Sequence, residues 1–139
     1  MNKKTIVAVI LIALIIIAAA VAIGYAARPL PPGRIALSAT EFDFGTIPNT
    51  GPVSQTFQVR NVGAGPLTIG EVSTSCGCTT AQVANRELAP GETADLTVTY
   101  DPLAHGGATG SFLRQVFIRS NDPDTPEARL TIRVTVVQP

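Results

Sequence analysis

The sequence predicts an all-β domain, an antiparallel β-sandwich of about seven or eight strands, behind one N-terminal transmembrane helix. Two observations predict the sandwich. After residue 34, turn-forming residues recur about every 8 to 12 positions, and no helical period interrupts them. Apolar and polar side chains also alternate along 94–100 and 129–137, as they do in strands that bury one face. A third observation, an uncharged apolar segment near the N-terminus, predicts the helix.

The apolar segment runs from Thr5 to Ala27 and contains no charged residue. Its 23 residues would form a helix of roughly 34 Å, enough to span a hydrocarbon core of about 30 Å. Lys3 and Lys4 precede it, so we expect the N-terminus inside the cytoplasmic membrane and the domain outside, where thiols can be oxidised. The alternative is a signal peptide that is cleaved to release a secreted domain.

Three regions follow from this pattern: an anchor at 1–27, a proline-rich spacer at 28–33 and the sandwich domain at 34–139. Short alternating runs mark the strands of the domain, and clusters of Gly, Pro, Asn and Asp separate them. The candidate strands are 34–38, 41–47, 54–61, 67–72, 79–83, 94–100, 111–119 and 129–137.

The composition of the domain disfavours several classes of function. Residues 28–139 carry eight arginines against ten acidic residues, and both lysines lie before the apolar segment. This balance is unfavourable for nucleic acid or phosphate binding. The chain has no Trp, one His and two Cys, which is too little for a multi-histidine metal site, a haem ligand pair or a disulfide scaffold. We therefore expect no catalytic residues and no cofactor.

A series of short motifs has a spacing that resembles one bacterial family. The motifs are Phe42-Asp43-Phe44-Gly45, Asn61 to Ile69, Ser75-Cys76-Gly77-Cys78-Thr79, Leu88 to Glu92 and Ser120 to Pro123. Together they resemble the domain of unknown function fifteen-seventy-three, over about residues 40 to 136. The resemblance implies an immunoglobulin-like sandwich related to Hydin-like modules, an extracytoplasmic location and a cysteine pair that belongs to the family pattern. It implies no activity, because the family has none established.

Cys76-Gly77-Cys78 is the one motif that could carry chemistry, and three interpretations remain open. The cysteines could form a local disulfide or redox-labile pair, which would require a turn at Gly77. Such a small loop stabilises a fold by only about 1.6 kcal/mol, which favours a redox role over a structural one. They could also be plain buried thiols, or they could bind Cu(I), for which two thiolates can suffice.

Two further candidates are weaker. His105, between Ala104 and Gly106, could be a third ligand or a base, but an exposed loop histidine without a role is the simpler interpretation. Asn121, Asp122 and Asp124 superficially suggest calcium. They lack the glycine and distal glutamate of a calcium loop, so a turn is the better prediction.

The sequence therefore predicts a membrane-anchored, non-enzymatic interaction module outside the cytoplasmic membrane. Its partner would be a protein or a cell-envelope polymer, and Thr5 to Ala27 would hold it in the membrane. The alternative is a thiol redox or Cu(I)-handling protein that acts through Cys76 and Cys78.

Overall fold

The computed structural model describes residues 2–26, 29–104 and 106–139, and it separates into two compact units. The first unit ends at Leu30 and the second runs from Pro31 to Pro139. The first unit contains helix α1 (Lys3–Ala26), whose apolar side chains are exposed. From Lys3 to Tyr25, the helix is long and apolar enough to cross a membrane, a property it shares with signal sequences. It begins two residues before the predicted segment, because Lys3 and Lys4 form its first turn.

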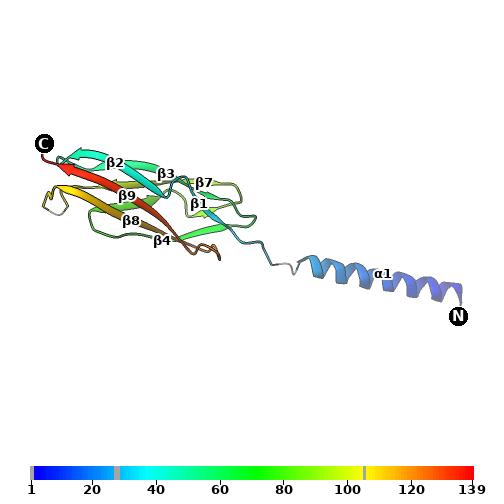
Figure 1. Cartoon of the computed structure of the whole chain (residues 1–139). Coiled ribbons are helices and arrows are strands. Elements are labelled where there is room, and N and C mark those ends of the chain that lie inside the picture. Colours follow the sequence, from blue (N-terminus) through cyan, green and yellow to red (C-terminus); the bar gives the residue numbers. More distant parts are fainter. Residues whose placement is uncertain (1, 27–28, 105) are drawn as a thin grey trace. The chain divides into compact units, whose positions relative to one another are not determined.

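The second unit is a sandwich of two β-sheets (Figure 1). The four-stranded sheet contains, in spatial order, β1 (Ile35–Leu37), β3 (Val53–Asn61), β7 (Thr93–Tyr100) and β5 (Thr79–Val83). The five-stranded sheet contains β2 (Glu41–Pro48), β9 (Glu127–Val137), β8 (Gly110–Ser120), β4 (Leu67–Thr74) and β6 (Glu87–Leu88). The eight predicted strands are all present, and their ends lie within two residues of the predicted ones.

The core lies between the two sheets and is built by strict alternation along the strands. In β7 every second residue is buried, and the same is true of β9. The core residues of these two strands are Ala94, Leu96, Val98, Tyr100, Ala128, Leu130, Ile132, Val134 and Val136. Because the side-chain period of a strand is two, polar residues between them face outward. The predicted sandwich and its two clearest strands are confirmed.

Two features of the sandwich differ from the prediction. A ninth strand, β6, has only two residues, so it shows no alternation that a sequence could reveal. Strand β2 pairs with β9 in parallel, whereas all the other strand pairs of the part that the structure describes are antiparallel. The β2–β9 register shifts between Asp43 and Thr46, where Gly45 has a φ of 71°. Glycine occupies this left-handed conformation without the strain that a side chain would add.

Asn61 connects the start of the domain to its centre. Its side chain is fully buried, and its Oδ1 accepts the backbone N–H groups of Arg34 and Gly63. Its Nδ2 donates to the carbonyl oxygens of Gly65 and Leu88. A buried amide satisfied on both sides fixes the surrounding loops. The segment from Pro31 to Arg34, most of which was expected to be spacer, thus packs within the second unit.

Candidate functional site

The connection between β4 and β5 passes from one sheet to the other and carries the cysteine motif. Strand β4 ends at Thr74 and β5 begins at Thr79. Between them the chain turns, and the backbone N–H of Thr79 donates to the carbonyl of Cys76 at 3.3 Å. The turn brings the two Cα atoms of Cys76 and Cys78 to 5.3 Å, and the cysteines form a disulfide. A separation of about 4.4 to 6.8 Å is normal for such a bond.

The two sulfur-bearing residues lie in different environments. Cys78 is 3% exposed and belongs to the hydrophobic core, whereas Cys76 is partly exposed and packs against that core. The hydroxyl oxygen of Thr79 lies 3.5 Å from Cys76 Sγ and 3.8 Å from Cys78 Sγ. Gly77 is exposed, and a Cβ atom added to it would meet nothing within 4 Å. One face of the disulfide turn is therefore open and the other is packed.

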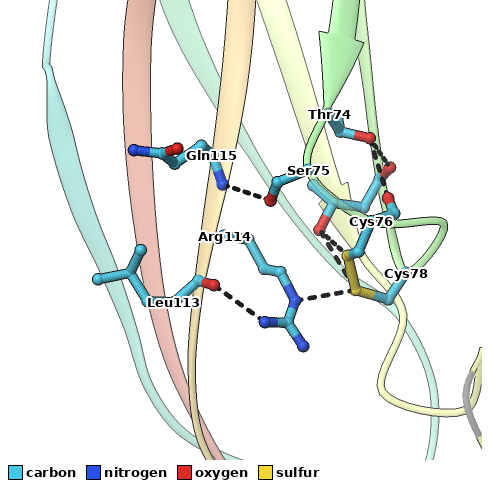
Figure 2. Close-up of a disulfide and its surroundings, with 8 residues drawn as sticks. Thr74, Ser75, Cys76, Cys78, Leu113, Arg114 and Gln115 are labelled. Atoms are coloured by element: carbon cyan, nitrogen blue, oxygen red, sulfur yellow. Dashed lines mark hydrogen bonds between the residues drawn. A yellow bond between two sulfur atoms is a disulfide. The ribbon is translucent and has the colours of Figure 1, made fainter.

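Arg114 of β8 reaches across to the disulfide (Figure 2). Its Nε donates to Cys78 Sγ at 3.1 Å, and its Nη1 donates to the carbonyl of Leu113 at 2.9 Å. The guanidinium carbon also lies 5.0 Å from the centre of the Phe112 ring, a cation–π contact. Among the ion pairs of the described residues, none includes Arg114. Its positive charge is thus directed at a sulfur and not at a carboxylate.

A small hollow of about 30 Å³ lies beside Cys78. Tyr100, Asp101, Phe112 and Arg114 are among the residues that line it. Burial raises the pKa of Tyr100, the positive charge of Arg114 opposes this, and the negative charge of Asp101 adds to it. The hollow has a size that suits one or two water molecules.

Arg114 was not among the predicted site residues, although the sequence holds a signal for it. In β8, Phe112, Arg114, Val116 and Ile118 occupy alternate positions, and Val116 and Ile118 are fully buried. An arginine in register with core residues is unusual, because such a charge needs a partner. That partner, Cys78, is 36 residues away and could be found only from the fold.

Asn121, Asp122 and Asp124, the other predicted candidates within the described residues, do not join this site. His105 lies outside the described residues. The part of the chain that the structure describes contains no group of three or more His, Cys, Asp or Glu side chains that could hold a metal ion. Asp122, 3% exposed, accepts the backbone N–H groups of Ile35, Asp124 and Thr125 and thereby stabilises a turn. The turn interpretation of 121–126 is consistent with these bonds.

The fold and the disulfide define a class of protein. It is an immunoglobulin-like or PapD-like β-sandwich with a local Cys-Gly-Cys disulfide in a connection that crosses from one sheet to the other. Residues 35–136 match the model of the family described as "Protein of unknown function (DUF1573)", and the chain belongs to this family. The family resemblance seen in the sequence is thereby confirmed. No curated protein matches the sequence.

Solved structures support the same fold. A protein of unknown function from Porphyromonas gingivalis W83 is similar with a TM-score of 0.69 and 28% identity, over 80% of this chain and 50% of that one. The chain thus spans about half the length of that protein. PapD-like domain 7 of human CEP192 has a TM-score of 0.57 and 9% identity, over 81% of this chain and 90% of that one. The periplasmic chaperone SfaE has a TM-score of 0.51 and 12% identity, over 76% of this chain and 61% of that one.

Proposed function

We propose that the protein is a non-enzymatic interaction module on the outer side of the cytoplasmic membrane, anchored by α1 with its N-terminus inside. The observation that carries this proposal is β2, an eight-residue strand at the edge of the five-stranded sheet with β9 as its neighbour. An edge strand presents backbone donors and acceptors that a strand of a partner can bind. The fold is also that of the periplasmic chaperone SfaE, although the low identity supports the fold alone.

Site-specific photo-crosslinking in cells tests this interaction. A photoreactive amino acid replaces Asp43, which is exposed on β2, and in a matched control it replaces Thr56, which is exposed on β3 inside the other sheet. We expect a discrete adduct with a protein or envelope polymer at position 43 and not at position 56. Equal adducts at both positions, or none at either, would contradict binding at this edge.

The anchoring of α1 needs a separate experiment, because a cleaved signal sequence would also form an apolar helix. Intact mass spectrometry of the mature protein from the membrane fraction distinguishes the two. We expect a mass that includes residues 1–27, together with protease accessibility of the sandwich from outside. A secreted chain that lacks α1 would support the alternative of signal cleavage.

A second candidate function is thiol redox chemistry, and the contact between Arg114 and Cys78 favours it. A guanidinium beside a sulfur stabilises the thiolate that reduction of the disulfide releases. The reduced pair would also offer two soft ligands for Cu(I). Neither role requires a bound cofactor in the oxidised form.

Replacing both cysteines by serine separates the two functions. If the module only binds a partner, the folded double variant keeps the crosslink at position 43 and tolerates copper and oxidative stress as the wild type does. If the pair acts in redox or copper chemistry, the folded variant loses that tolerance.

A further inference from the structure

We propose that thiols open the Cys76–Cys78 disulfide in one direction: the incoming thiolate bonds to Cys76 Sγ, and Cys78 leaves as the thiolate held by Arg114. This inference rests on the second candidate function, exchange of the pair with thiols, and assigns a role to each of its residues. The co-reactant is a dithiol, either of a partner protein or of a small molecule.

Access to the two sulfurs differs, and this difference selects Cys76 as the point of attack. Cys76 is partly exposed, and the neighbouring Gly77 leaves open space on the outer side of the turn. Cys78 is 3% exposed, and the hollow beside it is about 30 Å³, enough for one water molecule. An incoming thiolate therefore has a more open approach to Cys76 than to Cys78.

The charges around the disulfide select Cys78 as the leaving sulfur. A thiolate leaves faster when its charge is stabilised. Arg114 Nε lies 3.1 Å from Cys78 Sγ, and the guanidinium is fixed by the carbonyl of Leu113 and by the ring of Phe112. Burial by itself disfavours a thiolate at Cys78, so the nearby positive charge is needed there.

Two other titratable groups lie close to Cys78, and both are at the end of β7. Tyr100 and Asp101 line the same hollow as Cys78 and Arg114. The Asp101 carboxylate accepts the backbone N–H of Leu103 at 2.9 Å, and it forms no ion pair with Arg114 among the described residues. Tyr100 is neutral near pH 7, because the ordinary pKa of a phenol is about 10 and burial raises it further. The guanidinium charge therefore remains directed at Cys78.

The exchange balances in two steps. In the first, the thiolate of the dithiol forms a sulfur–sulfur bond to Cys76, the Cys76–Cys78 bond breaks, and its electron pair stays on Cys78. In the second, the other thiolate of the dithiol attacks the dithiol sulfur that is bonded to Cys76. The bond to Cys76 breaks, and Cys76 leaves as a thiolate that takes a proton from water. The dithiol is oxidised by two electrons and the cysteine pair is reduced by two.

Trapping of the mixed disulfide tests the direction of attack. The oxidised full chain in detergent micelles is mixed with reduced glutathione, exchange is stopped by acid at early times, and the adduct is located by peptide mass spectrometry. We expect at least about tenfold more glutathione on Cys76 than on Cys78. Equal adducts, or an excess on Cys78, would overturn the assignment and leave the redox function in place.

Substitution of Arg114 tests its part in the reaction. Arg114→Gln should slow reduction by glutathione by about threefold to tenfold, while Arg114→Lys, which keeps the charge, should recover most of the rate. Arg129→Gln is the matched control, because Arg129 stacks on Phe117 as Arg114 does on Phe112 and forms no bond to a sulfur. Equal rates for the wild type and Arg114→Gln would overturn the role of Arg114. A Gln variant and a Lys variant that are equally slow would indicate packing, not charge.

A thiolate titration provides a readout that packing alone would not change. In the Cys76→Ser chain, absorbance at 240 nm follows ionisation of Cys78, and adding Arg114→Gln should raise the thiol pKa by about one unit or more. An unchanged pKa would overturn the assignment. Failure of the second candidate function gives a different result: the wild-type pair then stays oxidised at every ratio of reduced to oxidised glutathione, and no adduct appears on either cysteine.

Discussion

The carboxylate of Asp122 binds the backbone N–H of Ile35 at 2.9 Å, although the two residues are 87 positions apart. Asp122 also accepts from Asp124 and Thr125 in its own turn and from the Arg34 side chain. The bond joins the first strand of one sheet to the loop between β8 and β9 of the other. This contact has measurable consequences for stability.

Replacing Asp122 should destabilise the sandwich. Asp122→Ala removes a buried acceptor and leaves several backbone donors unsatisfied, and we expect a loss of about 2 to 4 kcal/mol in the free energy of unfolding. Asp124→Ala is the control: its side chain is 72% exposed and pairs with Arg34 at the surface, so a change below about 1 kcal/mol is expected. Urea titration of the full chain in detergent, followed by circular dichroism, measures both. Similar losses for the two variants would contradict the role of Asp122.

The Asp122 carboxylate should also make the free energy of unfolding depend on pH in the acid range. Burial by itself raises the pKa of Asp122, but the N–H groups of Ile35, Asp124 and Thr125 and the Arg34 guanidinium outweigh it, so the pKa is lowered. A lowered folded-state pKa gives stability that is complete above the unfolded-state value of about 3.9 and is lost as the pH falls through the folded-state pKa. Unfolding curves between pH 7 and pH 2 should therefore show a steeper acid loss for the wild type than for Asp122→Asn. Parallel curves would contradict this linkage.

Asn61 should tolerate almost no change. Asn61→Asp replaces a buried donor to Gly65 and Leu88 by a charged acceptor, and we expect a loss of about 3 kcal/mol or more. Asn85→Asp is the matched control, because Asn85 is exposed and uses its oxygen to bind the N–H of Glu87. The free energies of unfolding of both variants, measured at pH 7, test this prediction. A loss for Asn61→Asp as small as that for Asn85→Asp would show that the loop does not depend on the Asn61 amide.

Leu96 and Leu113 provide a matched pair for the core. Leu96 in β7 is fully buried, and truncation to alanine should cost about 2 to 5 kcal/mol. Leu113 in β8 is 48% exposed, and the same truncation should cost less than about 1 kcal/mol. A comparable shift in the urea midpoint for both would contradict the inward face assigned to β7.

The disulfide should contribute little to global stability. Its loop is so short that reduction should lower the free energy of unfolding by about 1.6 kcal/mol. Urea titrations with and without a reducing agent measure this difference, and a chain that lacks cysteines, Cys76→Ala with Cys78→Ala, controls for effects of the reductant. A loss above about 4 kcal/mol would make the bridge a structural staple and weaken the case for exchange.

Much of the fold could be predicted because its signals are local. Alternation in 94–100 and 129–137 places one face of each strand in the core whatever the partner strand is. Turn residues likewise mark where strands end. The two-residue strand β6 was not predicted, because an alternation with a period of two is visible only over several residues. The parallel pairing of β2 with β9 was not predicted, because the alternation of apolar and polar side chains carries no information about strand direction.

The candidate site could also be predicted only in part. Cys76 and Cys78 could be singled out because their spacing and the absence of other reactive residue types are properties of the sequence. Their unequal burial could not be foreseen, because it depends on a turn that crosses between the sheets.

The sequence by itself determined the apolar N-terminal segment, the alternation that builds the sandwich and the cysteine pair, because each arises from interactions among near neighbours in the chain. The tertiary structure alone decided that Arg114 contacts Cys78 and that Asp122 contacts Ile35. These contacts join residues 36 and 87 positions apart, and the packing of one sheet on the other sets their distance.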